Sequence, residues 1–423
     1  MLKRGVRFWL SRRGITTLIL IVGAGLALLG GGVYALTNVW PGLGAQGIEV
    51  LRRLIGNEAV ASIETFVFEV EDGIQHLKYQ ISGATPQAPW ALSPTAVALS
   101  QPTSMPPEPN PLNQESRIVS PPGSDQVSAS TAYSQPVAIS APQGWQPAPV
   151  TPLGSMVGEG EWSAYLLKNN SDQNVAYRTF LQPDPSRPYA VVSVVAFDLN
   201  ALRLHFVLGS EEPQSPVRVK RTGKIPAADF QPDKILAAFN GGFKTEHGHF
   251  GVMVNGITVL PPRQGLGTVA IYADGRVQLG EWGTDITASP DISVWRQNGP
   301  LLIHDGQINP HTADNAPQDW GYTVKGGTAT WRSALGLSAD GRTLYYAAGA
   351  NITLPALTQA LANAGAAQAI QLDINNYWVH FDAFQLEGDQ LQPAPLMDAM
   401  KSKADDRYVK GFTRDFFYVT LTN

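Results

Sequence analysis

The sequence Ala237-Ala238-Phe239-Asn240-Gly241-Gly242-Phe243-Lys244-Thr245-Glu246-His247-Gly248-His249-Phe250-Gly251-Val252-Met253 joins an apolar run to a turn and a group of charged side chains. The run Ile235–Phe239 is continuously apolar and of strand length, which predicts a buried strand. The strand ends at Asn240-Gly241-Gly242, where two successive residues without Cβ allow the backbone to approach a ligand closely.

Four polar side chains follow this turn within six positions: Lys244, Glu246, His247 and His249. Acid, base and cation on a loop at a strand end are typical of a functional site. The alternative is a hairpin corner whose polar side chains face water. His247 is a candidate general acid or base because histidine titrates near neutral pH. His247 and His249 would share a face, and so chelate a metal, only in a strand, with a distant third ligand such as Asp373. We predict no metal site and no cofactor.

Hairpin signals recur through the C-terminal part of the chain. Asn255-Gly256, Asp274-Gly275, Asp305-Gly306 and Asp340-Gly341 each lie between β-rich runs and supply the positive φ that tight turns need. Strand-length runs are also present at Tyr189–Phe197, Ala201–Leu208 and Gln368–Leu372. The pattern predicts an α+β domain over residues 151–423 with a mostly antiparallel sheet core and few helices.

One helix is predicted inside this domain. Thr353 is a suitable N-cap, Pro355 suits the first turn, and Gly365 suits the end. Leu357, Leu361 and Ala364 lie on one face between them, so this helix should bury that face against the sheet.

The N-terminal segments predict a membrane anchor. Residues 1–14 form a basic tip with five cationic and no acidic side chains. Ile15–Leu36 is uncharged and apolar and, at about 1.5 Å per residue, crosses a hydrocarbon core of about 30 Å. The positive-inside rule places the N-terminus in the cytoplasm and the C-terminal domain outside it. A cleaved signal peptide is the alternative.

Two segments separate this anchor from the domain. Residues 43–81 carry apolar side chains at an average spacing of about 3.6, which predicts one long amphipathic helix, or two helices broken near Gly56 or Gly73. Its apolar face must pack on its own domain, on a second copy or on a membrane surface. Residues 82–150 are rich in Pro, Ser and Gln and predict a disordered linker.

Charge and composition exclude some classes. The net charge of −5 argues against a general nucleic-acid binder, and the absence of cysteine excludes disulfides and Cys metal sites. The composition leaves the oligomeric state open.

Two further segments carry candidate site residues. Arg332, next to Trp331 among small residues, suits forked recognition of phosphate or carboxylate, and Lys325 would add charge to such a pocket. The alternative is an Arg paired with a structural carboxylate. Asp373 ends a buried strand and is followed by amides and aromatics, which is typical of a sugar-binding edge; an Asx turn beside a packed core is the other interpretation. The binding candidates in this run are Asn375, Asn376 and Trp378, whereas His380 is interpreted as an ordinary strand residue.

Taken in order, these motifs resemble the phosphodiester glycosidase domain family, which includes the mannose 6-phosphate uncovering enzyme. The resemblance covers Tyr189–Tyr418 and rests on the order of its motifs: Asn240-Gly241-Gly242-Phe243, Asn255-Gly256, Asn298-Gly299-Pro300-Leu301, Arg332-Ser333-Ala334-Leu335-Gly336 and Leu372-Asp373. Where the family continues with a glycine-rich run after Leu-Asp, this chain has Ile374-Asn375-Asn376-Tyr377, so it resembles a divergent branch.

The resemblance implies hydrolysis of sugar 1-phosphodiesters. Asn240, Arg332 and Asp373 stand at matching motif positions and, with His247 as the other candidate acid or base beside Asp373, are the expected catalytic residues. The expected substrate-binding residues are the amides and Trp378 together with Gly241, Gly242, Lys244, His249 and Lys325. The expected substrates are envelope polymers or glycolipids. The alternative is a non-catalytic glycan-binding module tethered to the membrane.

Overall fold

The computed structural model describes residues 47, 52, 54–82, 87–90, 144–167, 173–313, 320, 327–400 and 406–422. The predicted basic tip, the predicted anchor Ile15–Leu36 and most of the predicted linker lie outside these residues. Within the described part of the chain, no helix is long and apolar enough to cross a membrane.

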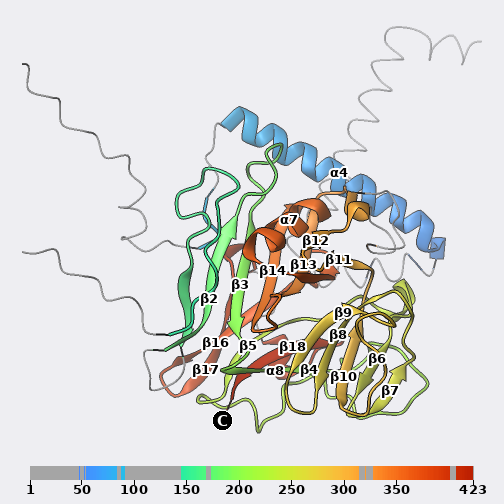
Figure 1. Ribbon diagram of the computed structural model, residues 1–423. Helices are drawn as coiled ribbons and strands as arrows, with labels where there is room; N and C mark the ends of the chain where they lie inside the picture. The colour runs from blue at the N-terminus through green and yellow to red at the C-terminus, as the bar shows by residue number, and fades with distance from the viewer. Residues whose placement is uncertain are drawn as a thin grey trace, which may run out of the picture.

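The domain is built from three antiparallel sheets (Figure 1). The largest has the order β1-β2-β3-β14-β13-β15-β11-β12, and the others have the orders β17-β16-β5-β18-β4 and β7-β6-β10-β8-β9. All pairings between these strands are antiparallel, as predicted. The strands are β1 (Ser163–Leu167), β2 (Asn174–Leu181), β3 (Val192–Asp198), β4 (Leu202–Val207), β5 (Ile235–Asn240), β6 (Val252–Val254), β7 (Ile257–Leu260), β8 (Gly267–Tyr272), β9 (Val277–Glu281), β10 (Ile292–Gln297), β11 (Leu301–His304), β12 (Gln307–Ile308), β13 (Thr330–Leu337), β14 (Thr343–Ile352), β15 (Gln368–Ile374), β16 (Phe381–Glu387), β17 (Gln390–Pro395) and β18 (Phe416–Leu421).

The four predicted turns each connect neighbouring antiparallel strands: β6 to β7, β8 to β9, β11 to β12 and β13 to β14. Asn255-Gly256 and Asp305-Gly306 have positive φ at both residues, whereas the other two turns have it only at Gly275 and Gly341. The dipeptides therefore mark the hairpins correctly, although they adopt more than one turn geometry.

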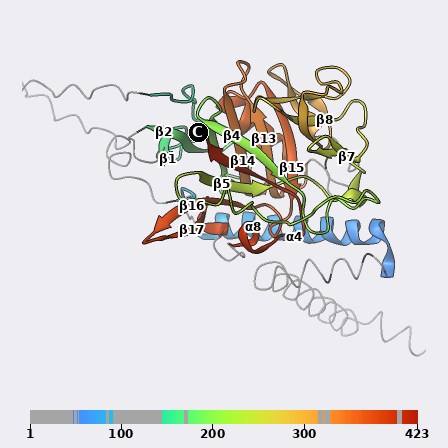
Figure 2. The same cartoon turned by 90° about the horizontal axis from the view of Figure 1, so that it is seen from below.

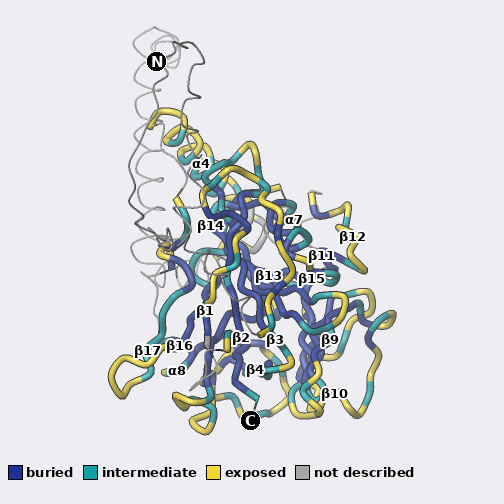
Figure 3. Tube along the Cα trace, turned by 60° about the vertical axis from the view of Figure 1, so that its left-hand side comes forward, coloured by how far each residue is buried: buried dark blue, intermediate teal, exposed yellow. Residues whose placement is uncertain are grey.

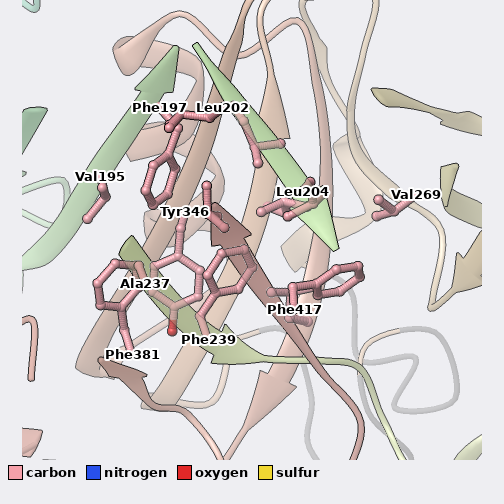
Figure 4. Close-up of a cluster of buried hydrophobic side chains, with 14 of the residues drawn as sticks. Val195, Phe197, Leu202, Leu204, Ala237, Phe239, Val269, Tyr346, Phe381 and Phe417 are labelled. Atoms are coloured by element: carbon pink, nitrogen blue, oxygen red, sulfur yellow. The ribbon is translucent and has the colours of Figure 1, made fainter. Parts of the chain in front are cut away.

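An aromatic core joins the largest sheet to the sheet that contains β5 (Figure 4). The ring of Phe239 in β5 lies 4.9 Å from that of Tyr346 in β14, and Phe381 and Phe417 pack beside it. Large buried rings contribute strongly to stability because each removes much apolar surface from water. This packing fixes the end of β5 against the middle of the largest sheet.

The predicted helix is α7 (Leu354–Ala364), which packs on the opposite face of the largest sheet. The Thr353 side chain accepts a hydrogen bond from Ala356 N, and Gly365 ends the helix in a left-handed conformation. The shorter helical elements are η2 (Thr245–His247), η3 (Pro310–Ala313), η4 (Asp398–Met400) and α8 (Arg407–Lys410).

Helix α4 (Asn57–Ser82) is the long amphipathic helix. It runs as one helix through Gly73, and Gly56, with positive φ, lies just before it. Figures 1 and 2 show α4 outside the sheets, and Figure 3 shows that much of it is exposed. The described ends of the predicted linker are packed, since Trp90 and Val150 are buried against the domain.

Candidate active site

Asn240, the last residue of β5, links its own sheet to the largest sheet through its side chain. Its amide nitrogen donates to Ser333 Oγ (2.9 Å) and to Gly241 O, and its amide oxygen accepts from the Tyr346 hydroxyl (3.0 Å) and from His380 N. These bonds use both donors and both lone pairs of the amide. Asn240 therefore positions its neighbours and has no hydrogen-bonding capacity left for a substrate, contrary to the direct contact that we expected.

Ser333 connects Asn240 to the strand that carries Asp373. Its hydroxyl lies 3.2 Å from Asp373 O and 3.3 Å from Asp373 N. The pairing of β13 with β15 shifts register here, since Ala334 pairs with Gln371 but Arg332 pairs with Ile374. Such a bulge interrupts the alternation of side chains and re-aims one of them. In this case Leu372 and Asp373 together lie opposite Ser333, so the bulge includes Asp373.

Arg414 holds the Asp373 carboxylate from the loop before β18. Its guanidinium donates to Asp373 Oδ2 (2.7 Å) and to Gly242 O (2.9 Å). It also lies over the Trp378 ring, 4.7 Å from the centroid. Both charged side chains are almost fully buried. Arg414 Nε is buried and has no hydrogen-bond acceptor among the described residues.

This environment shifts the acidity of the carboxyl group. Burial raises the pKa of Asp373 to about 6, although Arg414 opposes the shift. Asp373 therefore changes charge close to neutral pH, which suits a group that exchanges protons with a substrate or water.

The turn η2 brings basic side chains to the same region. Glu212 accepts a hydrogen bond from Thr245 N and anchors the turn. Lys244 Nζ lies 6.0 Å from the centroid of the Trp378 ring that Arg414 also covers. Burial, together with Arg52, Arg414 and Lys244, holds the pKa of His247 well below its ordinary value. His247 is thus a neutral imidazole among cations at neutral pH.

One of these cations comes from outside the domain. Arg52, in the segment before α4, lies with Nη1 2.8 Å from His247 Nε2, and Glu64 of α4 holds its other nitrogen through two 3.0 Å contacts. The exposed Glu246 carboxylate lies 3.6 to 3.9 Å from Arg52, Lys244 and His247. A carboxylate at the meeting point of three basic groups marks a position that favours an anion.

The two glycines of the turn are required by the protein itself. A Cβ on Gly241 would collide with Asp415, and one on Gly242 would lie about 3 Å from Arg296 and Asn298. Arg296 and Asp415 form a buried ion pair at 2.7 Å. The close approach that we predicted therefore exists, but its partners are protein side chains.

Arg332 does not reach this cluster. It is fully buried, and its guanidinium donates to Thr328 O, Ile352 O and Gln371 Oε1. Burial lowers its pKa to about 9, so it remains cationic. In these contacts, carbonyl groups of Thr328, Ile352 and Gln371 hold the cation. We therefore no longer assign Arg332 a contact with phosphate.

The remaining candidates differ in placement. His247 lies in a 3₁₀ turn and His249 is exposed with positive φ, so the two do not share a strand face as a chelating pair would require. No group of three His, Asp or Glu side chains suited to a metal occurs among the described residues. Lys325 lies outside those residues.

The run after Asp373 forms an Asx turn. Asn375 Oδ1 accepts from Tyr377 N (2.9 Å), and Asn375 has positive φ. Asn376 and Trp378 are half-buried. The Trp378 ring is covered by Arg414 and packs near Phe412, so it supports the cations rather than offering a free face to a sugar.

Sequence reasoning missed three features of this region. Arg414 and Asp415 directly precede the wholly buried strand β18. Polar residues next to a buried strand are the same signal that indicated Asn240 and Asp373. His380, interpreted as an ordinary strand residue, is fully buried and lies 3.0 Å from Asp382. Arg52 lies in the predicted amphipathic helical segment, and nothing in the sequence around it indicates a contact with the site.

The fold and site define a β-rich domain with a buried carboxyl group of raised pKa beside a basic cluster, an arrangement suited to hydrolysis of an anionic substrate. Residues 233–373 match the family model of the phosphodiester glycosidases. This part of the chain is therefore similar to the phosphodiester glycosidases, which are hydrolases, in agreement with the resemblance in the sequence.

Solved structures similar to this chain include the zebrafish N-acetylglucosamine-1-phosphodiester alpha-N-acetylglucosaminidase catalytic domain auto-inhibited by its pro-peptide, at 17% identity, covering 62% of this chain and 87% of that one, with a TM-score of 0.38. A hypothetical protein from Synechocystis matches at 13% identity, 55% and 59% coverage and a TM-score of 0.32. A putative exported protein from Burkholderia pseudomallei matches at 12% identity, covering 55% of this chain and 74% of that one, with a TM-score of 0.27. No curated protein matches the chain.

Proposed function

We propose that this protein is a membrane-anchored, extracytoplasmic hydrolase of sugar 1-phosphodiester bonds in envelope polymers or glycolipids. The family of its domain supports the reaction class. The observation that carries the proposal is the pairing of a buried Asp373, whose pKa is about 6, with Arg414 next to the basic side chains of η2.

The basic cluster suits the phosphate of such a substrate. Arg414 and Lys244 lie over one Trp378 ring, and Arg414 has an unused buried donor within the described part of the chain. Cations fixed before the reaction stabilise charge that develops on a leaving phosphate without reorganising. Because a phosphate leaves as an anion, it needs little protonation.

Asp373 then serves as a general base. Water attacks the anomeric carbon, and its proton passes to the Asp373 carboxylate. The bond between that carbon and the phosphate oxygen breaks, and the electron pair stays on the phosphate. The products are the free sugar and a phosphate monoester, and Asp373 returns its proton to solvent. Ser333 and Asn240 hold the strand end that carries Asp373.

The proposed position of the domain outside the cytoplasm rests on the N-terminal sequence. The apolar run Ile15–Leu36 would be the single bilayer span, and the cationic residues before it would keep the N-terminus in the cytoplasm. Protease accessibility of the domain in intact cells, with cytoplasmic markers protected, tests this topology.

The reaction is tested with full-length protein in detergent and an aryl diester of a sugar 1-phosphate. Asp373→Asn should lower kcat by about 10² or more, as loss of a general base does. Asp291→Asn removes a carboxylate from an exposed position of the same domain and should leave kcat unchanged. Turnover by Asp373→Asn at the wild-type rate, with an unchanged melting temperature, would remove Asp373 from the mechanism. Glycan affinity without turnover across a broad panel of diesters would support the binding module instead.

A further inference from the structure

Helix α4 docks on the domain through its polar side. Arg187 donates to both oxygens of Asp72 at 2.7 to 3.0 Å, and the Tyr189 hydroxyl donates to Asp72 Oδ1. The ring of Tyr79 packs on Tyr189, with centroids 5.8 Å apart. At the other end of the helical segment, Arg52 reaches His247. Polar and aromatic side chains therefore make the described contacts at both ends.

The apolar side of α4 faces away from the domain. Six large apolar side chains of the helix are 38% to 76% exposed: Ile63, Phe66, Val70, Ile74, Leu77 and Ile81. At 3.6 residues per turn, positions 3, 7, 11, 14 and 18 after Ile63 share its face. Asp72, nine residues after Ile63, lies half a turn away. Figure 3 shows this exposure along α4.

A stripe of this length requires a partner, because exposed apolar area of this kind marks an interaction surface. Among the three partners that the sequence left open, the domain itself is excluded, since it contacts the opposite side. We propose that this face of α4 lies on the surface of a lipid bilayer, so that the site acts on glycosyl phosphodiesters whose aglycone is a membrane lipid. The substrate part of this proposal rests on the proposed hydrolase function.

Two observations favour a bilayer over a second copy of the chain. The predicted span ends at Leu36, and exposed apolar side chains are already present at Leu54 and Ile55, just before α4. The short segment between them keeps α4 close to the membrane. The apolar spacing also averages about 3.6, which keeps the stripe straight along one helix, whereas a long paired helix favours 3.5.

The same placement brings the site to the bilayer. Leu54 and Ile55, both exposed, follow Arg52 by two and three residues. Arg52 contacts His247 in the basic cluster. A phosphate bound there would therefore lie next to the segment that joins the site to the lipid-facing helix. A lipid-borne diester suits this position, and a polymer remote from the bilayer does not.

The first experiment locates the helix. The chain has no cysteine, so Ile63→Cys can be labelled uniquely with an environment-sensitive fluorophore in the full chain, reconstituted in phosphatidylcholine nanodiscs. Ile257→Cys in β7 is the matched control, because Ile257 is 47% exposed and Ile63 is 46% exposed. Brominated lipid should remove most of the fluorescence at position 63 and little at position 257. Equal quenching at both positions, or disulfide crosslinking of two copies through Ile63→Cys, would overturn the proposal.

The second experiment tests the substrate class in the same nanodiscs. The double substitution Ile74→Gln with Leu77→Gln should lower kcat/KM by about tenfold on an embedded polyprenyl glycosyl phosphodiester. The reason is that helix α4 would then bind the bilayer less tightly and hold the site near its substrate for less of the time. Turnover of a water-soluble methyl diester should change by less than about twofold. If the wild-type protein cleaves the soluble diester but not the embedded one, the lipid substrate is rejected. If neither diester is cleaved, the hydrolase proposal fails, while the quenching result still decides where α4 lies.

Discussion

The Asp373 carboxyl group experiences two opposing influences. Burial removes the water that would stabilise its charge and raises its pKa, whereas the Arg414 guanidinium at 2.7 Å lowers it. Burial dominates, and the pKa is about 6. The proton that this group exchanges is therefore available close to neutral pH.

This value predicts a rising pH profile. As a general base Asp373 must be ionised, so kcat/KM on a soluble diester should increase as the pH rises through about 6 and then level off. His247 should not contribute to this limb, because the pKa of His247 lies well below its ordinary value. A profile that falls through pH 6 would instead make Asp373 a general acid.

The same shift affects stability with a defined sign. The folded protein holds the Asp373 proton more tightly than the unfolded chain, whose carboxyl has an ordinary pKa near 3.8. The contribution of this group is thus present at low pH and is lost as the pH rises through about 6. As the pH rises from the ordinary pKa of the carboxyl group through the folded value of about 6, the melting temperature should fall less in Asp373→Asn than in the wild type.

The sequence can locate a residue that ends an obvious strand, but it cannot assign a role that depends on the direction of a side chain. Asn240 and Asp373 stand out because apolar runs precede them. Their separate roles, one saturated with hydrogen bonds and one re-aimed by a bulge, are set by partners from distant strands. Arg414 was missed because its importance comes only from packing against Asp373 and Trp378.

At the scale of elements, β13 shows why Arg332 was misassigned. The strand is buried on both faces, so its sequence contains no alternation of apolar and polar residues. Either neighbour, Arg332 or Ser333, could therefore have faced the site. In the structure Ser333 bonds Asn240, and Arg332 bonds carbonyl groups instead. The hairpin turns were predictable because their signal is local.

Because Arg332 and Ser333 have different partners, substitutions at the two positions should differ in their effects on stability and on kcat. Arg332→Met leaves the Thr328 and Ile352 carbonyls and the Gln371 amide without their donor, which should cost on the order of 3 kcal/mol of stability and change kcat of the folded enzyme by less than about tenfold. Ser333→Ala should cost about 1 kcal/mol yet lower kcat more than Arg332→Met does. Denaturant unfolding and kinetics on both variants test this, and a larger loss of kcat in Arg332→Met would return that arginine to the site.

At the scale of the whole molecule, α4 couples a distant contact to the candidate site. The helix is fixed at Asp72 by Arg187 and Tyr189, and Arg52 of the same segment lies at His247. A helix of 26 residues is about 39 Å long. Loosening the Asp72 contact should therefore be detectable at His247, because Glu64 of α4 holds Arg52 there.

Asp72→Asn tests this coupling. It removes the charge that Arg187 binds, so hydrogen exchange should increase along α4 while the sheets stay protected. As Arg52 spends less time at His247, the pKa of His247, followed by NMR, should rise toward its ordinary value, because one of the cations that depress it withdraws. Asp184→Asn is the matched control, since Asp184 pairs with the same Arg187 at 3.1 Å but does not belong to the helix. An equal effect from both variants would mean that Arg187 acts through its own loop, and an unchanged His247 in Asp72→Asn would show that Arg52 holds the site without help from the rest of α4.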